Sequence, residues 1–201
     1  MNLEEVLARI EERLAALDMN PTEASRLAGK PDSIRNFRRA VASGKPGGMN
    51  TTTLAALAPV LRTTPEWLTN GGGNPPIPLL SWVAASKLAE FGEVKDGDDI
   101  EYIPNIDLGP GNWICLRVVG DSMDRIAPDG SKIFIDLNDK ALSDGGYYVC
   151  HNRGQATFKR YRKTNGFQRL VPFSTNPNHD DVFVEGDLQI VGRVRRVVSD
   201  L

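Results

Sequence analysis

The hydrophobic pattern of this chain changes its period near residue 70, and this change constrains the fold more than any other feature. Before it, apolar residues recur at helical spacing, as in Leu3, Val6, Leu7 and Ile10. After it, short apolar runs alternate with clusters of Gly, Pro, Asn and Asp, which is typical of strands and turns. Residues 70–76 hold three glycines and two prolines, a composition typical of a linker. The pattern predicts an all-α domain over 1–69 and a mostly-β domain over 77–201.

Helix-capping and helix-breaking residues divide the first domain into five predicted helices. The first spans residues 3–17. Asn20-Pro21 begins the second, which spans 22–28 with Thr22 near its cap, and Gly29 ends it. The third begins at residue 32 or 33 and turns Ile34 and Phe37 toward the core. Residues 50 and 64 open the fourth and fifth helices, and we expect Trp67 of the fifth to fill the core.

The second and third predicted helices, joined by a short glycine-containing turn, form a helix-turn-helix arrangement with the third helix in the major groove. The run resembles the DNA-binding domain of Cro and lambda-repressor-like regulators over about residues 3–69. Lys30-Pro31 replaces the usual turn residues, so the register of base contacts is open by one position. The resemblance implies DNA contacts by the exposed polar residues of the third helix and by a lysine after it; the alternative is a solvated helix face. These residues are Ser33, Arg35, Asn36, Arg38, Arg39 and Lys45.

A serine and a lysine in the second domain form a candidate nucleophile and base. Ser122 follows the apolar run 118–119 and Gly120-Asp121, where glycine permits a sharp turn. Lys159 lies 37 positions later in a predicted strand, on the opposite face from Ala156 and Phe158. A lysine that is kept neutral by burial can take the proton of a serine hydroxyl. Spacing alone is more typical of an ordinary turn and a solvated lysine than of a catalytic pair.

The order of motifs around this pair adds a family resemblance. Ser122 is followed by Pro128-Asp129-Gly130, the predicted strand 132–136, Asp144-Gly145-Gly146 and Phe158-Lys159-Arg160. The stretch from residue 77 to 201 resembles the self-cleaving domain of LexA and the lambda-type phage repressors. The resemblance implies a LexA-like fold in which Ser122 attacks a peptide bond of its own chain and Lys159 accepts the proton.

The resemblance also implies where the chain is cut. Family members cleave after a small residue, commonly in Ala-Gly, and the matching bond here is Ala85–Ser86. We expect residues 78–86 to form a surface loop that delivers this bond, the alternative being an ordinary edge strand. Serine in place of glycine adds a Cβ, which predicts slower cleavage.

Bulk properties narrow the function classes. The net charge is −2 over 201 residues, which excludes a chain coated in positive charge but permits a local basic patch. No apolar run is long enough to span a membrane and no signal peptide is visible, so we expect a cytoplasmic protein. Cys115 and Cys150 lie in apolar strand patterns and are predicted to be reduced core thiols. With His151 and His179 they lack metal-ligand spacing, so neither a metal nor another cofactor is expected.

The combined prediction is a multi-domain, dimeric transcriptional repressor with a carboxy-terminal dimerisation and self-cleaving serine endopeptidase domain. Its operator is an imperfect palindrome in double-stranded DNA, and cleavage near Ala85–Ser86 separates the DNA-binding domains from the dimerisation domain. The resemblance implies induction by the RecA–single-strand DNA filament that forms after DNA damage (the SOS response). The alternative is a non-cleaving repressor whose second domain only dimerises and receives an antirepressor or other signal.

Overall fold

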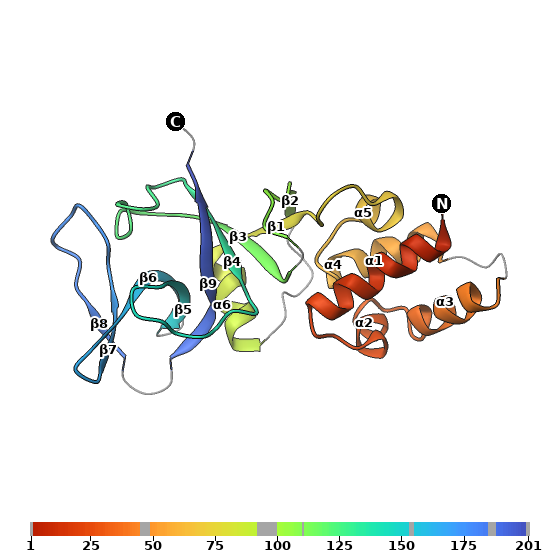
Figure 1. Cartoon of the computed structure of the whole chain (residues 1–201), viewed down its shortest axis with the longest axis horizontal. Helices are drawn as coiled ribbons and strands as arrows, with labels where there is room; N and C mark the ends of the chain where they lie inside the picture. Colours follow the sequence, from red (N-terminus) through yellow and green to blue (C-terminus); the bar gives the residue numbers. More distant parts are fainter. Residues whose placement is uncertain are drawn as a thin grey trace. The chain divides into compact units, whose positions relative to one another are not determined.

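The structure, a computed structural model, describes residues 2–44, 49–91, 100–109, 111–152, 155–184 and 188–199 (Figure 1). The chain separates into two compact units. The helical unit comprises Met1–Pro78 and Tyr102–Asn112, and the sheet unit comprises Leu79–Glu101 and Trp113–Leu201.

The helical unit contains the five helices that the sequence predicts. They are α1 (Leu3–Ala16), α2 (Pro21–Leu27), α3 (Ser33–Ala42), α4 (Thr51–Val60) and α5 (Pro65–Asn70). The side chains of Asn20, Asn50 and Thr64 each accept a backbone N–H at the start of a helix, which satisfies a donor that has no partner inside the helix. Asn20-Pro21 begins the second helix as predicted, with Asn20 as its cap, and the helix spans Pro21–Leu27, one residue earlier than the predicted 22–28.

One apolar core holds these helices together. The predicted core residues Ile34 and Phe37 of α3 are buried, and Trp67 is buried as predicted. They pack with the apolar faces of α1, α4 and α5, formed by Val6, Ile10, Leu14, Leu54, Leu57, Leu61 and Leu68.

The start of α3 is capped in an unusual way. Asp32 occupies the cap position with a left-handed φ of 57° and its side chain makes no capping hydrogen bond. The buried hydroxyl of Ser25 instead accepts the N–H of Ile34 at 3.3 Å and lies 3.3 Å from the hydroxyl of Ser33. These contacts fix α3 against α2.

The segment Tyr102–Asn112 belongs to the helical unit through two arginines. Arg13 is buried and donates to the carbonyl oxygens of Leu61 at 3.0 Å and Gly111 at 2.8 Å. Burial lowers the pKa of Arg13 to about 10. Arg62 donates to Oδ1 of Asn112 at 2.6 Å. The compact units are thus divided differently from the predicted domains (1–69, linker 70–76, 77–201), whose boundaries stay a prediction.

The described strands form one mostly antiparallel sheet in the order β2-β1-β3-β4-β9-β5-β6-β7-β8 (Figure 1). Strand β4 covers the predicted residues 132–136, and β1 is parallel to β3. The strands are β1 (Ile77–Leu80), β2 (Glu101–Ile103), β3 (Trp113–Arg117), β4 (Lys132–Asp136), β5 (Tyr147–Asn152), β6 (Gln155–Thr164), β7 (Phe167–Val171), β8 (Val182–Phe183) and β9 (Gln189–Val198).

The prediction that residues 78–86 form a surface loop is wrong. Strand β1 is followed directly by helix α6 (Trp82–Phe91), in which Ala85 is fully buried. The hydroxyl of Ser81 accepts the N–H of Ala84 at 3.1 Å and caps the helix. Ala84, Ala85 and Leu88 then pack against the sheet, so burial of apolar residues at helical spacing stabilises a helix there.

Both cysteines are free and buried, as predicted for core thiols. Burial raises the pKa of Cys115 and of Cys150 to about 12, so neither thiol ionises near neutral pH. In the part of the chain that the structure describes, no helix has the length and apolar character needed to cross a membrane.

Candidate active site

Ser122 lies on a tight turn between β3 and β4. Gly120 has a φ of 87°, which favours glycine, and its N–H donates to Oδ1 of Asp129 at 2.7 Å. The chain then makes a helical turn, closed by the N–H of Ala127 and the carbonyl oxygen of Met123 at 2.9 Å. Met123 is buried in the core of the sheet unit. This anchor presents the neighbouring Ser122 side chain at the surface of the core, half-buried.

Lys159 of β6 reaches this serine. Its Nζ donates to Oγ of Ser122 at 2.8 Å and to the carbonyl oxygen of Phe158 at 3.0 Å. Burial lowers the pKa of Lys159 below its ordinary value, because the charged ammonium loses hydration. A hydroxyl within hydrogen-bond distance of an amine whose pKa is lowered by burial is the arrangement of an activated nucleophile.

A cleft of about 330 Å³ opens onto this pair. Val119 borders it and is 75% exposed. The other lining residues come from the start of α6, the Ser122 turn and the first half of β6, and are Trp82, Val118, Ser122, Met123, Gln155, Ala156, Thr157, Phe158 and Lys159. Apolar side chains line much of the cleft, and Gln155 and Thr157 add polar groups beside the Ser122–Lys159 pair, a lining that suits a short peptide segment.

The predicted scissile bond lies near this cleft but inside helix α6. Trp82 at the start of the helix lines the cleft and donates through Nε1 to the carbonyl oxygen of Arg117 at 2.8 Å. Ser86 accepts the N–H of Ala156 on its Oγ at 2.6 Å. With Ala85 fully buried, the structure does not bring the Ala85–Ser86 bond to Ser122.

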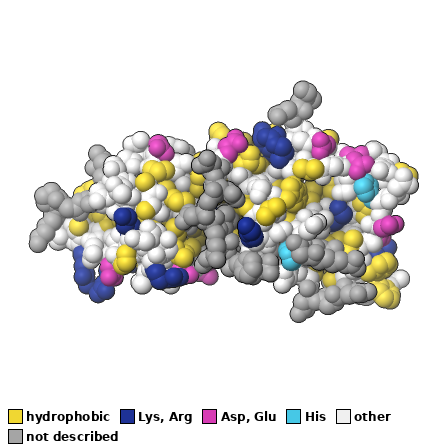
Figure 2. Space-filling view, turned by 180° about the vertical axis from the view of Figure 1, so that it is seen from behind, with side chains coloured by type: hydrophobic (Ala, Val, Ile, Leu, Met, Phe, Trp, Pro, Cys, Tyr) yellow, Lys and Arg dark blue, Asp and Glu magenta, His cyan; other side chains and the backbone are white. Residues whose placement is uncertain are grey.

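The side chains predicted to contact DNA lie in different environments. Arg35, Asn36 and Arg39 are exposed on α3. Arg38 is exposed and donates to both carboxylate oxygens of Glu11, at 2.6 and 2.5 Å, and these hydrogen bonds raise the pKa of Arg38. In Figure 2, basic side chains at the end of the helical unit that carries α3 lie beside acidic ones, and other basic side chains are spread over the face shown.

Two of the predicted DNA contacts stand apart from that exposed set. Ser33 is only half-exposed and its hydroxyl lies 3.3 Å from that of Ser25. Lys45 lies outside the described residues.

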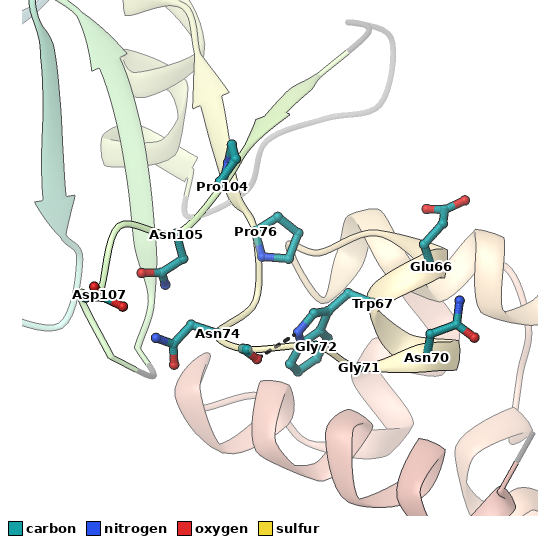
Figure 3. Close-up of a pocket in the computed structure, with 11 residues that line it drawn as sticks. Glu66, Trp67, Asn70, Gly71, Gly72, Asn74, Pro76, Pro104, Asn105 and Asp107 are labelled. Carbon is teal, nitrogen blue, oxygen red and sulfur yellow. Dashed lines mark hydrogen bonds between the residues drawn. The ribbon is translucent and has the colours of Figure 1, made fainter.

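A wider pocket of about 430 Å³ lies in the helical unit beside Trp67, whose Nε1 donates to the carbonyl oxygen of Gly73 at 3.3 Å (Figure 3). Two carboxylates and three asparagine side chains border it, together with glycines and prolines: Glu66, Asn70, Gly71, Gly72, Gly73, Asn74, Pro76, Pro104, Asn105 and Asp107. This lining offers no pairing of a nucleophile with a base, so the cleft at Ser122 is the better candidate for chemistry.

Two parts of the site were missed in the sequence. Trp82 borders the cleft, and its place three residues before the predicted bond was a usable signal. The irregular segment Phe173–His179 contacts the Ser122 turn, where the N–H of Phe173 donates to the carbonyl oxygen of Ser122 at 2.9 Å. No periodic pattern in that segment signals this role. Among the residues that the structure describes, no group of three or more His, Cys, Asp or Glu side chains could hold a metal ion.

Comparisons with known proteins place the sheet unit in a family. The Peptidase S24-like family model matches residues 78–195. The chain is similar to prophage repressor CohE of Escherichia coli K12, 35% identical over 124 residues, covering 59% of this chain and 54% of the relative. It is also similar to repressor protein CI of Enterobacteria phage phi80, 32% identical over 83 residues (40% of this chain and 34% of the relative). The LexA repressor of Parafrankia sp. is 32% identical over 165 residues (79% and 60%).

The alignments thus span between about a third and three fifths of these relatives' own lengths. The matched family model covers more than half of this chain and includes both Ser122 and Lys159. The chain therefore belongs to the peptidase S24-like family, with the LexA and phage repressors among its relatives.

Proposed function

We propose that this protein is a DNA-binding transcriptional repressor that Ser122 and Lys159 inactivate by cutting their own chain near Ala85–Ser86. The observation that carries the proposal is the 2.8 Å hydrogen bond between Nζ of Lys159 and Oγ of Ser122, with burial lowering the pKa of the lysine. Membership of the peptidase S24-like family and the repressor names of the relatives support it.

The proposed chemistry uses one proton carrier. Neutral Lys159 takes the hydroxyl proton of Ser122 as Oγ attacks the carbonyl carbon of Ala85. The protonated lysine returns the proton to the departing amide nitrogen of Ser86, and water then hydrolyses the acyl-serine. Backbone N–H groups of Ser122 and Met123, on the tight turn, are the proposed donors to the oxyanion.

The substrate segment must leave its helix before this reaction. An enzyme-bound peptide bond has to come within about 3–3.5 Å of the nucleophile, which a bond packed inside α6 cannot do. The first turn of α6 already borders the cleft through Trp82, and Ser86 is hydrogen-bonded to Ala156 of the same cleft. Unwinding α6 is therefore a local change, and its cost predicts slow cleavage of the free protein.

The helical unit supplies the proposed operator contact. Helix α3 presents Arg35, Asn36 and Arg39 to solvent, and these side chains can bind base edges in a major groove through paired hydrogen bonds. We propose Arg38 and Lys45 for phosphate contacts. Dimerisation through the sheet unit would tether two such helices on an imperfect palindrome. Cleavage that separates the helical units from the dimerised sheet units would therefore weaken operator binding.

Intact mass spectrometry of the purified protein after incubation at alkaline pH tests the proposal. We expect two fragments, residues 1–85 and 86–201, from the wild type and none from Ser122→Ala, with operator affinity equal in the two uncut proteins. Fragments from Ser122→Ala in the same yield would refute the assignment.

One observation favours a second candidate function. Ala85 is fully buried in α6, which is the state expected of a repressor that does not cut itself. In that case the sheet unit only dimerises and receives a signal, from an antirepressor instead of a RecA–DNA filament. Absence of fragments at every pH, together with specific operator binding, would favour this function.

A further inference from the structure

The turn that carries Ser122 is held by a segment distant in the sequence. Residues Phe173–His179 connect β7 to β8 and lie against residues 121–125. The backbones form two hydrogen bonds, from the N–H of Phe173 to the carbonyl oxygen of Ser122 at 2.9 Å and from the N–H of Arg125 to the carbonyl oxygen of Phe173 at 3.2 Å. We call the segment Phe173–His179 the brace.

The side chains of the residues on both sides of Ser122 also bind the brace. Asp121 accepts Nδ2 of Asn176 at 2.9 Å and lies 2.7 Å from Nε2 of His179. Asp124 accepts the N–H of Thr175 at 2.7 Å and also the hydroxyl of Thr175. The two carboxylates thus bind the brace at positions just before and just after the nucleophile.

These contacts stabilise the ionised carboxylates. The hydrogen bonds from Asn176 and then His179 lower the pKa of Asp121, and the hydrogen bond from Thr175 lowers the pKa of Asp124. Both carboxylates are therefore charged acceptors across the neutral and alkaline range, where charge-assisted hydrogen bonds are stronger than neutral ones.

The brace also connects the nucleophile to the strand that carries the base. Arg160, next to Lys159 on β6, pairs with Val171 at the end of β7. Two residues further on, Phe173 binds the carbonyl oxygen of Ser122, and its ring lies 5.3 Å below the guanidinium carbon of Arg160. A short path of paired backbone therefore sets the distance between Lys159 and Ser122.

We propose that Asp121 and Asp124 are positioning residues that, through the brace, keep Oγ of Ser122 in line with Nζ of Lys159. The inference rests on the proposed self-cleavage, because it assigns a role within that reaction. Neither carboxylate takes part in proton transfer. A displacement of about 1 Å at a nucleophile can lower a rate by up to a hundredfold, so loss of the brace is expected to be visible in kinetics.

The kinetic test compares Asp121→Ala with a matched control. Asp181→Ala removes another exposed aspartate, one whose carboxylate pairs with Arg169 at 2.9 Å and makes no contact with the Ser122 turn. We expect Asp121→Ala to cleave at least tenfold more slowly than the wild type, Asp121→Asn to recover part of the rate, and Asp181→Ala to match the wild type.

The pH profile separates positioning from a direct charge effect. A positioning role predicts a lower rate at every pH with the same midpoint as the wild type. A carboxylate that acted on the charge of Lys159 would instead shift the midpoint, and its removal would lower the pKa of the lysine. An unchanged rate or a shifted midpoint would overturn the proposal.

A measurement without cleavage decides the same question if the wild type yields no fragments. Amide hydrogen exchange, read by NMR, reports the N–H groups of Phe173, Arg125 and Thr175, which all donate hydrogen bonds between the brace and the Ser122 turn. We expect Asp121→Ala to speed exchange of Phe173 and Arg125 at least tenfold and Asp181→Ala to leave it unchanged. Exchange rates in Asp121→Ala equal to those of the wild type would refute the positioning role of Asp121. Absence of fragments from the wild type would refute only the proposed self-cleavage.

Discussion

Replacing Ser86 with glycine should accelerate self-cleavage, because Ser86 holds helix α6 in its folded form in two ways. Its hydroxyl accepts the N–H of Ala156 at 2.6 Å, and its backbone lies in the middle of α6. Glycine removes the hydroxyl and lowers the helical preference of the residue. Both changes favour the unwound segment that the reaction needs.

The size of the effect follows from these two contributions. Serine to glycine inside a helix costs about 0.5 kcal/mol. Loss of one hydrogen bond of this kind costs about 0.5–1.5 kcal/mol. The sum, about 1–2 kcal/mol, corresponds to roughly 5- to 30-fold faster cleavage while the helical form predominates.

Two control variants separate the contributions. Lys87→Gly weakens the same helix at an exposed position and leaves Ala85, Ser86 and the Ala156 contact intact, so roughly threefold acceleration is expected. Ser86→Ala removes the hydroxyl but strengthens the helix, so its rate should stay within roughly fivefold of the wild type.

The assay is the first-order loss of intact chain at alkaline pH, with the new amino terminus identified by mass spectrometry. Circular dichroism confirms that each variant is folded at the assay temperature. If Ser86→Gly cleaves at the wild-type rate and Lys87→Gly also has no effect, release of α6 does not limit the reaction. A new amino terminus at a residue other than 86 would show that the bond is misassigned.

Two further predictions concern DNA and stability. Arg35→Ala and Asn36→Ala should each weaken operator binding by about 1–3 kcal/mol and relax base preference. Arg38→Ala should weaken binding less, because Glu11 already binds its guanidinium. Equal losses of affinity for the three variants in fluorescence anisotropy titrations would contradict this. Lys159→Met should raise the urea midpoint at pH 7, because the folded pKa of the lysine is lowered and its charged form destabilises the fold below that pKa. This gain should shrink as the pH rises toward 10.5, and a gain that grew with pH would refute the burial argument.

Local signals in the sequence were sufficient for most helices and strands. Asn50 and Thr64 cap the helices they were expected to open, and β4 has the predicted bounds, because these features depend on neighbours a few residues away. The second helix begins at Asn20-Pro21 as predicted but spans residues one position earlier than 22–28, because Asn20 and not Thr22 is its cap.

Long-range features were harder to predict. Helix α6 replaced the expected loop because Ala84, Ala85 and Leu88 find a sheet to pack against, which no local pattern reveals. The closeness of Ser122 and Lys159 depends on the pairing of β5 with β6 and on the brace, so spacing alone could not predict it. Only the resemblance to a known family suggested that the two side chains meet.

The pH dependence of self-cleavage by the purified wild-type chain tests the central claim most directly. If neutral Lys159 is the base, the rate rises with pH and levels off below the ordinary lysine pKa of 10.5, because burial lowers the pKa of this lysine. Lys159→Arg, which stays charged throughout, and Ser122→Ala should yield no fragments at any pH. A rate that is flat from pH 7 to 10, or cleavage by Lys159→Arg at the wild-type rate, would contradict the assignment of Lys159 as the base.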